Sequence, residues 1–128
     1  MRRLAQIAGS LARARDGATA VEFALIAPVL FLLLLGLIEV GRAYWIQSAL
    51  DFAVQETARC GVVQAASPAC ATPAALQTYA AARVAPLQIP ATAFTVANAT
   101  CGVDVKAVVP YRFLAILGPT ITAEACRA

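Results

Sequence analysis

An apolar stretch near the start of the chain constrains the fold most. Residues 23–38 are sixteen consecutive residues without a charge, and Glu22 is the single charge between Ala18 and Ile38. At about 1.5 Å per residue, a helix of this length covers most of a roughly 30 Å hydrocarbon core. Helices of soluble proteins are seldom apolar on every face, and a chain of 128 residues could hardly cover one. The stretch predicts a transmembrane helix over residues 18–43, rather than a buried core helix.

The charge is distributed unevenly on the two sides of this stretch. Residues 1–17 carry four arginines and one aspartate, a net charge of +3, whereas the remainder holds six basic and six acidic residues. Positive charge marks the cytoplasmic side of a membrane segment. A nucleic-acid-binding face would need basic residues clustered on the folded part, and the sequence has no such cluster. We therefore expect a cytoplasmic N-terminus and no nucleic-acid partner.

Glu22 lies inside the apolar stretch, where a carboxylate costs about 3 kcal/mol or more near the bilayer centre and less near its edge. It follows Gly17 by five residues, and two arginines precede that glycine. The sequence RARDGATAVEF resembles the processing site of class IV prepilins, in which a membrane aspartyl peptidase cuts after the glycine. The resemblance implies cleavage between Gly17 and Ala18, with residues 1–17 removed as a basic leader.

Residues 20–43, AVEFALIAPVLFLLLLGLIEVGRA, resemble the TadE-like pseudopilins of the tight-adherence (Flp) pilus system. A weaker likeness lies in the VPYRF and ITAEACR stretches near the end of the chain. The resemblance implies a minor pilin or pseudopilin, a bacterial single-pass inner-membrane protein whose C-terminal domain is periplasmic. Its implied partners are a prepilin peptidase, other pilins and the Flp pilus assembly machinery. Whether the protein enters the pilus, at the tip or elsewhere, the sequence leaves open.

The resemblance also gives Glu22 an expected role in assembly. In assembled pilins, such a carboxylate meets the new N-terminal amine of a neighbouring subunit. A pair within one chain is the alternative, because Ala18 and Glu22 are four residues apart and share a helix face.

Two other functions remain open from the sequence. The first is an uncleaved single-pass anchor that presents a disulfide-linked periplasmic domain to another partner. The second is a secreted binding protein whose signal is removed, although the apolar run is longer than a typical signal and Gly41-Arg42-Ala43 is a poor cleavage site. The first residue of the mature chain separates the three: Ala18 for the pilin, Met1 for the anchor and Tyr44 for the secreted protein.

Charged and aromatic residues follow the apolar stretch at its outer end. Glu39 and Arg42 are three residues apart, a spacing that brings side chains together on a helix. Tyr44 and Trp45 are residue types that favour the membrane–water interface. We expect these four residues to mark the membrane boundary and to carry no chemistry.

All four cysteines, Cys60, Cys70, Cys101 and Cys126, follow the predicted membrane helix. Outside the inner membrane disulfides form and persist. A metal site is disfavoured, because the sequence has neither a CxxC pair nor a histidine. We favour Cys60–Cys70 and Cys101–Cys126. The second pairing is less secure, because strands two apart in a sheet lie roughly 9 to 10 Å from each other.

The predicted helix extends beyond the membrane, from about Ala20 to Arg59. Beyond residue 45 its residues separate into two faces, a polar stripe of Gln47, Asp51, Gln55 and Arg59 and an opposite face of Ile46, Ala49, Leu50, Ala53 and Thr57. This periodicity is typical of a helix that packs on one side. Cys60-Gly61 is the predicted end, since glycine commonly follows the last helical residue.

The exported domain, residues 44–128, is predicted to be α+β. In chain order we expect a helix over 74–85 after Thr72-Pro73, extended chain over 86–90, a strand over 92–100, a turn at Cys101-Gly102, a strand over 103–109, a loop over 111–119 and a strand over 121–125. The prediction is a three-stranded antiparallel sheet and a short second helix packed on the long helix.

No catalytic constellation is present in the sequence. There is no histidine and no glycine-rich phosphate loop, and the serines have no base nearby in sequence. Asp104 and Glu124 alternate with apolar residues on predicted strands, together with Lys106, which is the pattern of a solvated face. We therefore expect no enzyme activity, no cofactor and no metal, and interpret the chain as a substrate of an enzyme.

Overall fold

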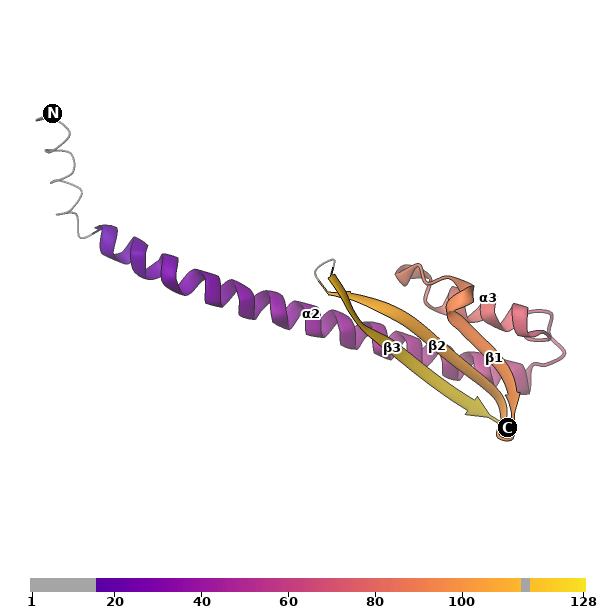
Figure 1. Ribbon diagram of the computed structural model, residues 1–128. Helices are drawn as coiled ribbons and strands as arrows, with labels where there is room; N and C mark the ends of the chain where they lie inside the picture. Colours follow the sequence, from indigo (N-terminus) through magenta and orange to yellow (C-terminus); the bar gives the residue numbers. More distant parts are fainter. Residues whose placement is uncertain (1–15, 114–115) are drawn as a thin grey trace, which may run out of the picture. The chain divides into compact units, whose positions relative to one another are not determined.

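The computed structural model describes residues 16–113 and 116–128 (Figure 1). The elements in chain order are α2 (Asp16–Val63), α3 (Pro73–Arg83), the short 3-10 helices η1 (Ala85–Leu87) and η2 (Ala91–Ala93), and the strands β1 (Phe94–Ala99), β2 (Gly102–Phe113) and β3 (Ile116–Arg127). The predicted fold class is confirmed: a long N-terminal helix, a short second helix and a three-stranded antiparallel sheet. Most of the predicted leader, residues 1–15, lies outside the described residues.

The chain divides between Ile38 and Glu39 into two compact units. In the first unit, every valine, leucine, isoleucine and phenylalanine of α2 from Val21 to Ile38 is exposed. Exposing such a surface to water would cost about 25 cal/mol of free energy per Å² of apolar area. Among the described residues, α2 is the one helix long and apolar enough to cross a membrane.

In the second unit, α2 buries one face against the sheet and α3 (Figure 1). Of the predicted apolar face, Leu50, Ala53 and Thr57 are fully buried and Ile46 and Ala49 are half-buried; Val54 and Ala58, which the prediction did not include, are fully buried beside them. The buried Thr57 hydroxyl donates a hydrogen bond of 2.7 Å to the Ala53 carbonyl, so its polar atom is satisfied within the helix. The core of the second unit is therefore built around the half of α2 that is amphipathic.

The sheet order is β1-β2-β3, with both pairs antiparallel. Val105 lies opposite Val96 on one side and Ala125 on the other. Val105 and Ala107 are fully buried and Val103 is half-buried, as the predicted alternation of β2 requires. The central strand thus supplies the middle of the core.

The predicted end of the long helix at Cys60-Gly61 is wrong, because α2 continues to Val63. A Cβ atom at Gly61 would lie 3.1 Å from Val103 Cγ1 and 3.2 Å from Leu76 Cδ1. These separations are tighter than ordinary van der Waals contact. The missing side chain of Gly61 therefore lets α2, the sheet and α3 approach one another closely. The glycine does not end the helix.

The predicted loop over residues 111–119 is also wrong. β2 continues to Phe113 and β3 begins at Ile116, with Arg112 opposite Leu117 and Phe113 opposite Ile116. The register shifts between Pro110 and Arg112, which accommodates a proline that cannot donate to the ladder. Pro119 lies in β3, an edge strand, where a missing N–H group is tolerated.

The connection from α3 to β1 differs from the predicted extended chain. Thr72 caps α3 as expected, its hydroxyl accepting the Ala75 N–H at 3.2 Å, but the helix ends at Arg83. Pro86 then lies in η1, because its fixed φ suits the first turn of a 3-10 helix. The left-handed Gln88 (φ 52°) ends η1, and η2 delays the start of β1 to Phe94.

Candidate functional site

The predicted processing site lies at the N-terminal end of α2. Gly17 and Ala18 both lie within α2, directly after Asp16, the first residue that the structure describes. A Cβ atom added to Gly17 would meet nothing within 4 Å, so the packing of the described residues does not require glycine at this position.

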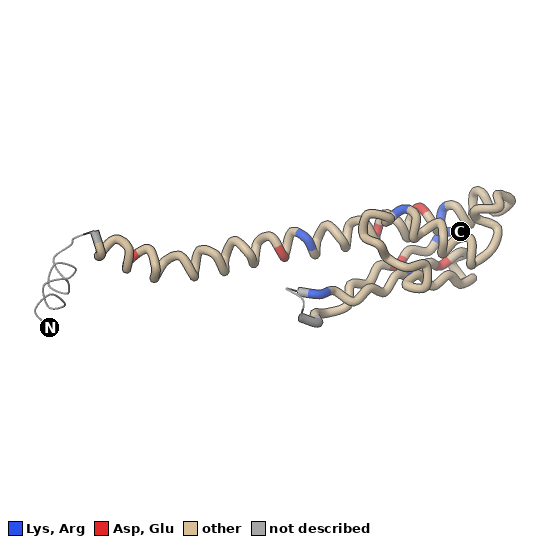
Figure 2. The backbone as a smooth tube through the Cα atoms, turned by 90° about the horizontal axis from the view of Figure 1, so that it is seen from above, with Lys and Arg blue, Asp and Glu red and all other residues tan. Residues whose placement is uncertain are grey.

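Glu22 lies one turn further along α2, and its side chain is exposed. Its position four residues after Ala18 places both on one face of the helix. Figure 2 shows a long uncharged tract of α2 beyond it, up to the next charges at Glu39 and Arg42. Gly17, Ala18 and Glu22 thus lie within six consecutive residues of one helix.

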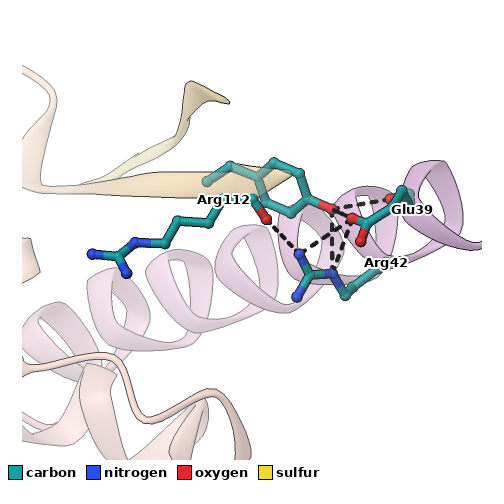
Figure 3. A network of polar contacts seen from close by, with 4 residues as sticks. Glu39, Arg42 and Arg112 are labelled. Carbon is teal, nitrogen blue, oxygen red and sulfur yellow. Dashed lines mark hydrogen bonds and ion pairs between the residues drawn. The ribbon is translucent and has the colours of Figure 1, made fainter. Parts of the chain in front are cut away.

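A polar cluster lies where the uncharged tract ends, in the second unit (Figure 3). Arg42 Nη2 is 3.2 Å from Glu39 Oε2, which confirms the contact expected from their spacing. The Tyr111 hydroxyl of β2 donates a hydrogen bond of 2.6 Å to the same Glu39 oxygen. Glu39, Arg42 and Tyr111 are called the boundary cluster below.

Within the boundary cluster, Arg42 links α2 to strand β2. Its Nη2 donates a hydrogen bond of 2.5 Å to the Arg112 carbonyl, and its Nε lies 3.3 Å from the Tyr111 hydroxyl oxygen. The guanidinium carbon is also 5.0 Å from the centre of the Tyr111 ring, within the range of a cation–π interaction. One helical side chain therefore contacts two consecutive residues of β2.

The contact with Glu39 raises the pKa of Tyr111 above its ordinary value of 10.0. The hydroxyl donates to the carboxylate, and this hydrogen bond is the largest cause, because a phenolate could not donate. Burial acts in the same direction, while Arg42 opposes both. Tyr111 is therefore held as a neutral donor.

Sequence reasoning missed Tyr111, because it fell in the predicted loop over residues 111–119. A signal was present: Val105, Ala107, Val109 and Tyr111 continue one period-two series. Tyr111 is 6% exposed, in keeping with that series.

The two other predicted boundary residues are not part of the cluster. Tyr44 and Trp45 are 76% and 55% exposed on α2. The structure therefore brings Glu39 and Arg42 together and leaves the aromatic pair on the helix surface, available to a membrane interface.

The four cysteines form two disulfides, Cys60–Cys70 and Cys101–Cys126, the pairings favoured from the sequence. The Cα atoms of the second pair are 6.0 Å apart. The distance between strands two apart does not separate this pair, because Cys101 lies in the turn between β1 and β2 and not in a strand. Gly102 follows with φ +112°, and a Cβ atom there would lie 2.0 Å from the Arg127 carbonyl oxygen. The turn thus approaches the end of β3 closely enough for the bond.

The polar outer face of the sheet agrees in part with the expectation for Asp104 and Glu124. Lys106 and Glu124 lie opposite each other and form a solvent-exposed ion pair of 3.1 Å. Asp104 is only half-exposed, and its Oδ1 atom is buried without a hydrogen-bond partner among the described residues. The Lys106 and Glu124 side chains are 49% and 57% exposed, so this part of the face is solvated.

Comparison with known proteins relates part of the chain to a protein family. Residues 17–59 match the family model TadE, described as TadE-like protein. No curated protein and no solved structure matches the chain. The matched segment contains Gly17, Glu22, Glu39 and Arg42, and it confirms the resemblance drawn from the sequence. The family is associated with Tad/Flp pili and is not an enzyme family.

Proposed function

We propose that this chain, a TadE-like protein over residues 17–59, is a minor pilin or pseudopilin that takes part in assembly of Flp-type pili. It is made as a precursor and cleaved after Gly17 by a prepilin peptidase. Residues 18–43 cross the inner membrane once, with the N-terminus cytoplasmic and residues 44–128 periplasmic. Other pilins and the pilus assembly machinery are its partners.

The observation that carries this proposal is the contrast between the two halves of α2. From Val21 to Ile38 every large apolar side chain is exposed, whereas beyond Glu39 one face is buried in a folded domain. An apolar surface of this extent needs either lipid or the apolar helices of other subunits. A pilin needs both in turn, first in the membrane and then in the assembly.

The surroundings of the scissile bond support processing. Gly17 and Ala18 are exposed, and a Cβ atom at Gly17 would meet nothing within 4 Å, so no packing among the described residues shields the bond. A peptidase that binds the backbone closely at the cut excludes a side chain at Gly17. The glycine is then required by the peptidase and not by the fold.

Replacement of Gly17 tests the processing step. Gly17→Val should accumulate a precursor about 2 kDa heavier than the mature form, the share of 13.3 kDa carried by 17 of 128 residues. Immunoblotting of cells that contain the peptidase measures it. Gly36→Val is the matched control, because Gly36 lies in the same helix and a Cβ there also meets nothing within 4 Å. A product of mature size from Gly17→Val would refute cleavage at this bond.

The first residue of the mature chain separates the proposal from its alternatives. Terminal sequencing should find Ala18. Met1 would indicate an uncleaved single-pass anchor that presents its domain to another partner, and Tyr44 would indicate a secreted protein with a removed signal.

A further inference from the structure

A cavity of about 240 Å³ lies beside the boundary cluster in the second unit. Its lining combines two cationic side chains with aliphatic ones: Arg42, Arg112, Ile46, Leu87, Ile89 and Ile121. α2, the η1 region and both strands of the β2–β3 pair contribute to it. No described residue that lines it carries a carboxylate, but Glu39 lies beside the lining and pairs with Arg42, so Arg112 supplies the positive charge that remains.

The two arginines differ in whether a carboxylate pairs with their charge. Arg42 is paired with Glu39 at 3.2 Å. The Arg112 side chain is exposed, and Figure 3 shows it directed away from Glu39 and Arg42. Among the described residues, its guanidinium has no ion-pair partner. Its donors are therefore available to an anion, and a guanidinium matches the geometry of a phosphate.

The position of Arg42 on α2 indicates which molecule carries that phosphate. Arg42 is the fourth residue after Ile38, where the uncharged tract ends. At about 1.5 Å per residue this is roughly 6 Å, within the headgroup layer of about 5 to 8 Å on each side of the hydrocarbon core. Arg42, and the Arg112 backbone carbonyl that it contacts at 2.5 Å, thus lie at the depth of lipid phosphates.

We infer that the cavity binds an anionic phospholipid of the surrounding bilayer. Arg112 contacts the headgroup phosphate, and Leu87, Ile89 and Ile121 contact the glycerol and the upper part of an acyl chain. The aliphatic lining favours a lipid over a free inorganic anion, because a free anion gains nothing from it. The inference rests on the membrane placement in the proposed function, and deepens it by naming a lipid ligand for the folded domain.

Replacement of Arg112 tests the site. The full chain in detergent micelles is given equal amounts of phosphatidylglycerol and phosphatidylcholine, and bound lipids are counted by native mass spectrometry. The wild type should prefer phosphatidylglycerol, and Arg112→Gln should lower that preference roughly fivefold, the equivalent of one arginine near an anionic surface. Arg59→Gln removes an equal charge from an exposed position of α2 outside the cavity, and should leave the preference unchanged.

Each contrary result bears on a different part of the inference. Equal preference in the wild type and Arg112→Gln, or an equal fall in Arg59→Gln, would overturn the site. Displacement of phosphatidylglycerol by millimolar inorganic phosphate would overturn the lipid as its ligand. Wild-type protein released from membranes by an alkaline carbonate wash would refute the membrane placement, and this inference with it. Protein that stays in the membrane without lipid preference refutes the inference alone.

Discussion

At the scale of single residues, Glu22 is the most informative carboxylate, because it lies in an otherwise uncharged part of α2. We propose that it pairs with the Ala18 amine of a neighbouring subunit. Glu22→Ala should still be inserted and cleaved, since the peptidase acts at Gly17, but should lose association with partner pilins. Breaking a buried ion pair typically costs about 3 to 5 kcal/mol, enough to lower recovery of the complex more than a hundredfold. Co-purification of the cleaved protein with its partners measures this.

The control for Glu22 is Glu56→Ala, which removes a carboxylate from the same helix in the second unit. Its co-purification with partners should equal that of the wild type. Wild-type recovery from cleaved Glu22→Ala would instead favour a carboxylate that only extends to the cytoplasmic headgroups.

Tyr111 carries a second prediction at this scale. Its hydrogen bond to Glu39 raises its pKa, so the folded state holds the phenolic proton more tightly than the unfolded state. The resulting stabilisation is fully present below the unfolded pKa of 10.0, and is lost as the pH rises through the higher folded value. The difference between the alkaline absorbance titrations of the wild type and Tyr111→Phe should have its midpoint above 10.0. A midpoint at or below 10.0 would show that the hydrogen bond does not form in solution.

At the scale of elements, the turn between β1 and β2 depends on Gly102. Its φ of +112° is a conformation that side-chain-bearing residues rarely adopt, and an added Cβ would lie 2.0 Å from the Arg127 carbonyl oxygen. Gly102→Ala should lower the free energy of unfolding by about 1 to 3 kcal/mol. Non-reducing peptide mapping should also find less of the Cys101–Cys126 disulfide, because the turn must move away from β3. Urea unfolding measures the first effect.

Gly41→Ala provides the comparison for that turn. Gly41 lies in α2, and a Cβ there would meet nothing within 4 Å. Its unfolding midpoint should equal or exceed that of the wild type, because alanine favours helix over glycine by about 1 kcal/mol. An equal midpoint for Gly102→Ala would mean that the turn adopts another conformation in solution.

At the scale of the whole molecule, α2 belongs to both units and changes character between them. Its first part is apolar on every side, and its second part buries one face and exposes polar residues on the other. The boundary cluster marks the first charged turn after the uncharged tract and joins α2 to β2.

The features that the sequence alone determined are those set by local pattern. The uncharged tract, the two faces of α2 near Leu50, the Thr72 cap and the alternation around Val105 each depend on neighbours in sequence and on the solvent that each face meets. These patterns were sufficient for the fold class. They also located Gly17 and Glu22 on one helix, although their roles stay predictions.

Only the tertiary structure decided the features that depend on contacts distant in sequence. Gly61 has the local pattern of a helix end, yet α2 continues past it, and Val103 and Leu76 approach the glycine closely there. Tyr111 contacts Glu39 because the register of β2 places position 111 beside α2, 72 residues earlier in the chain. A local pattern specifies which face a side chain takes, but its partner depends on the register and packing of the elements, which arise only when the whole core forms.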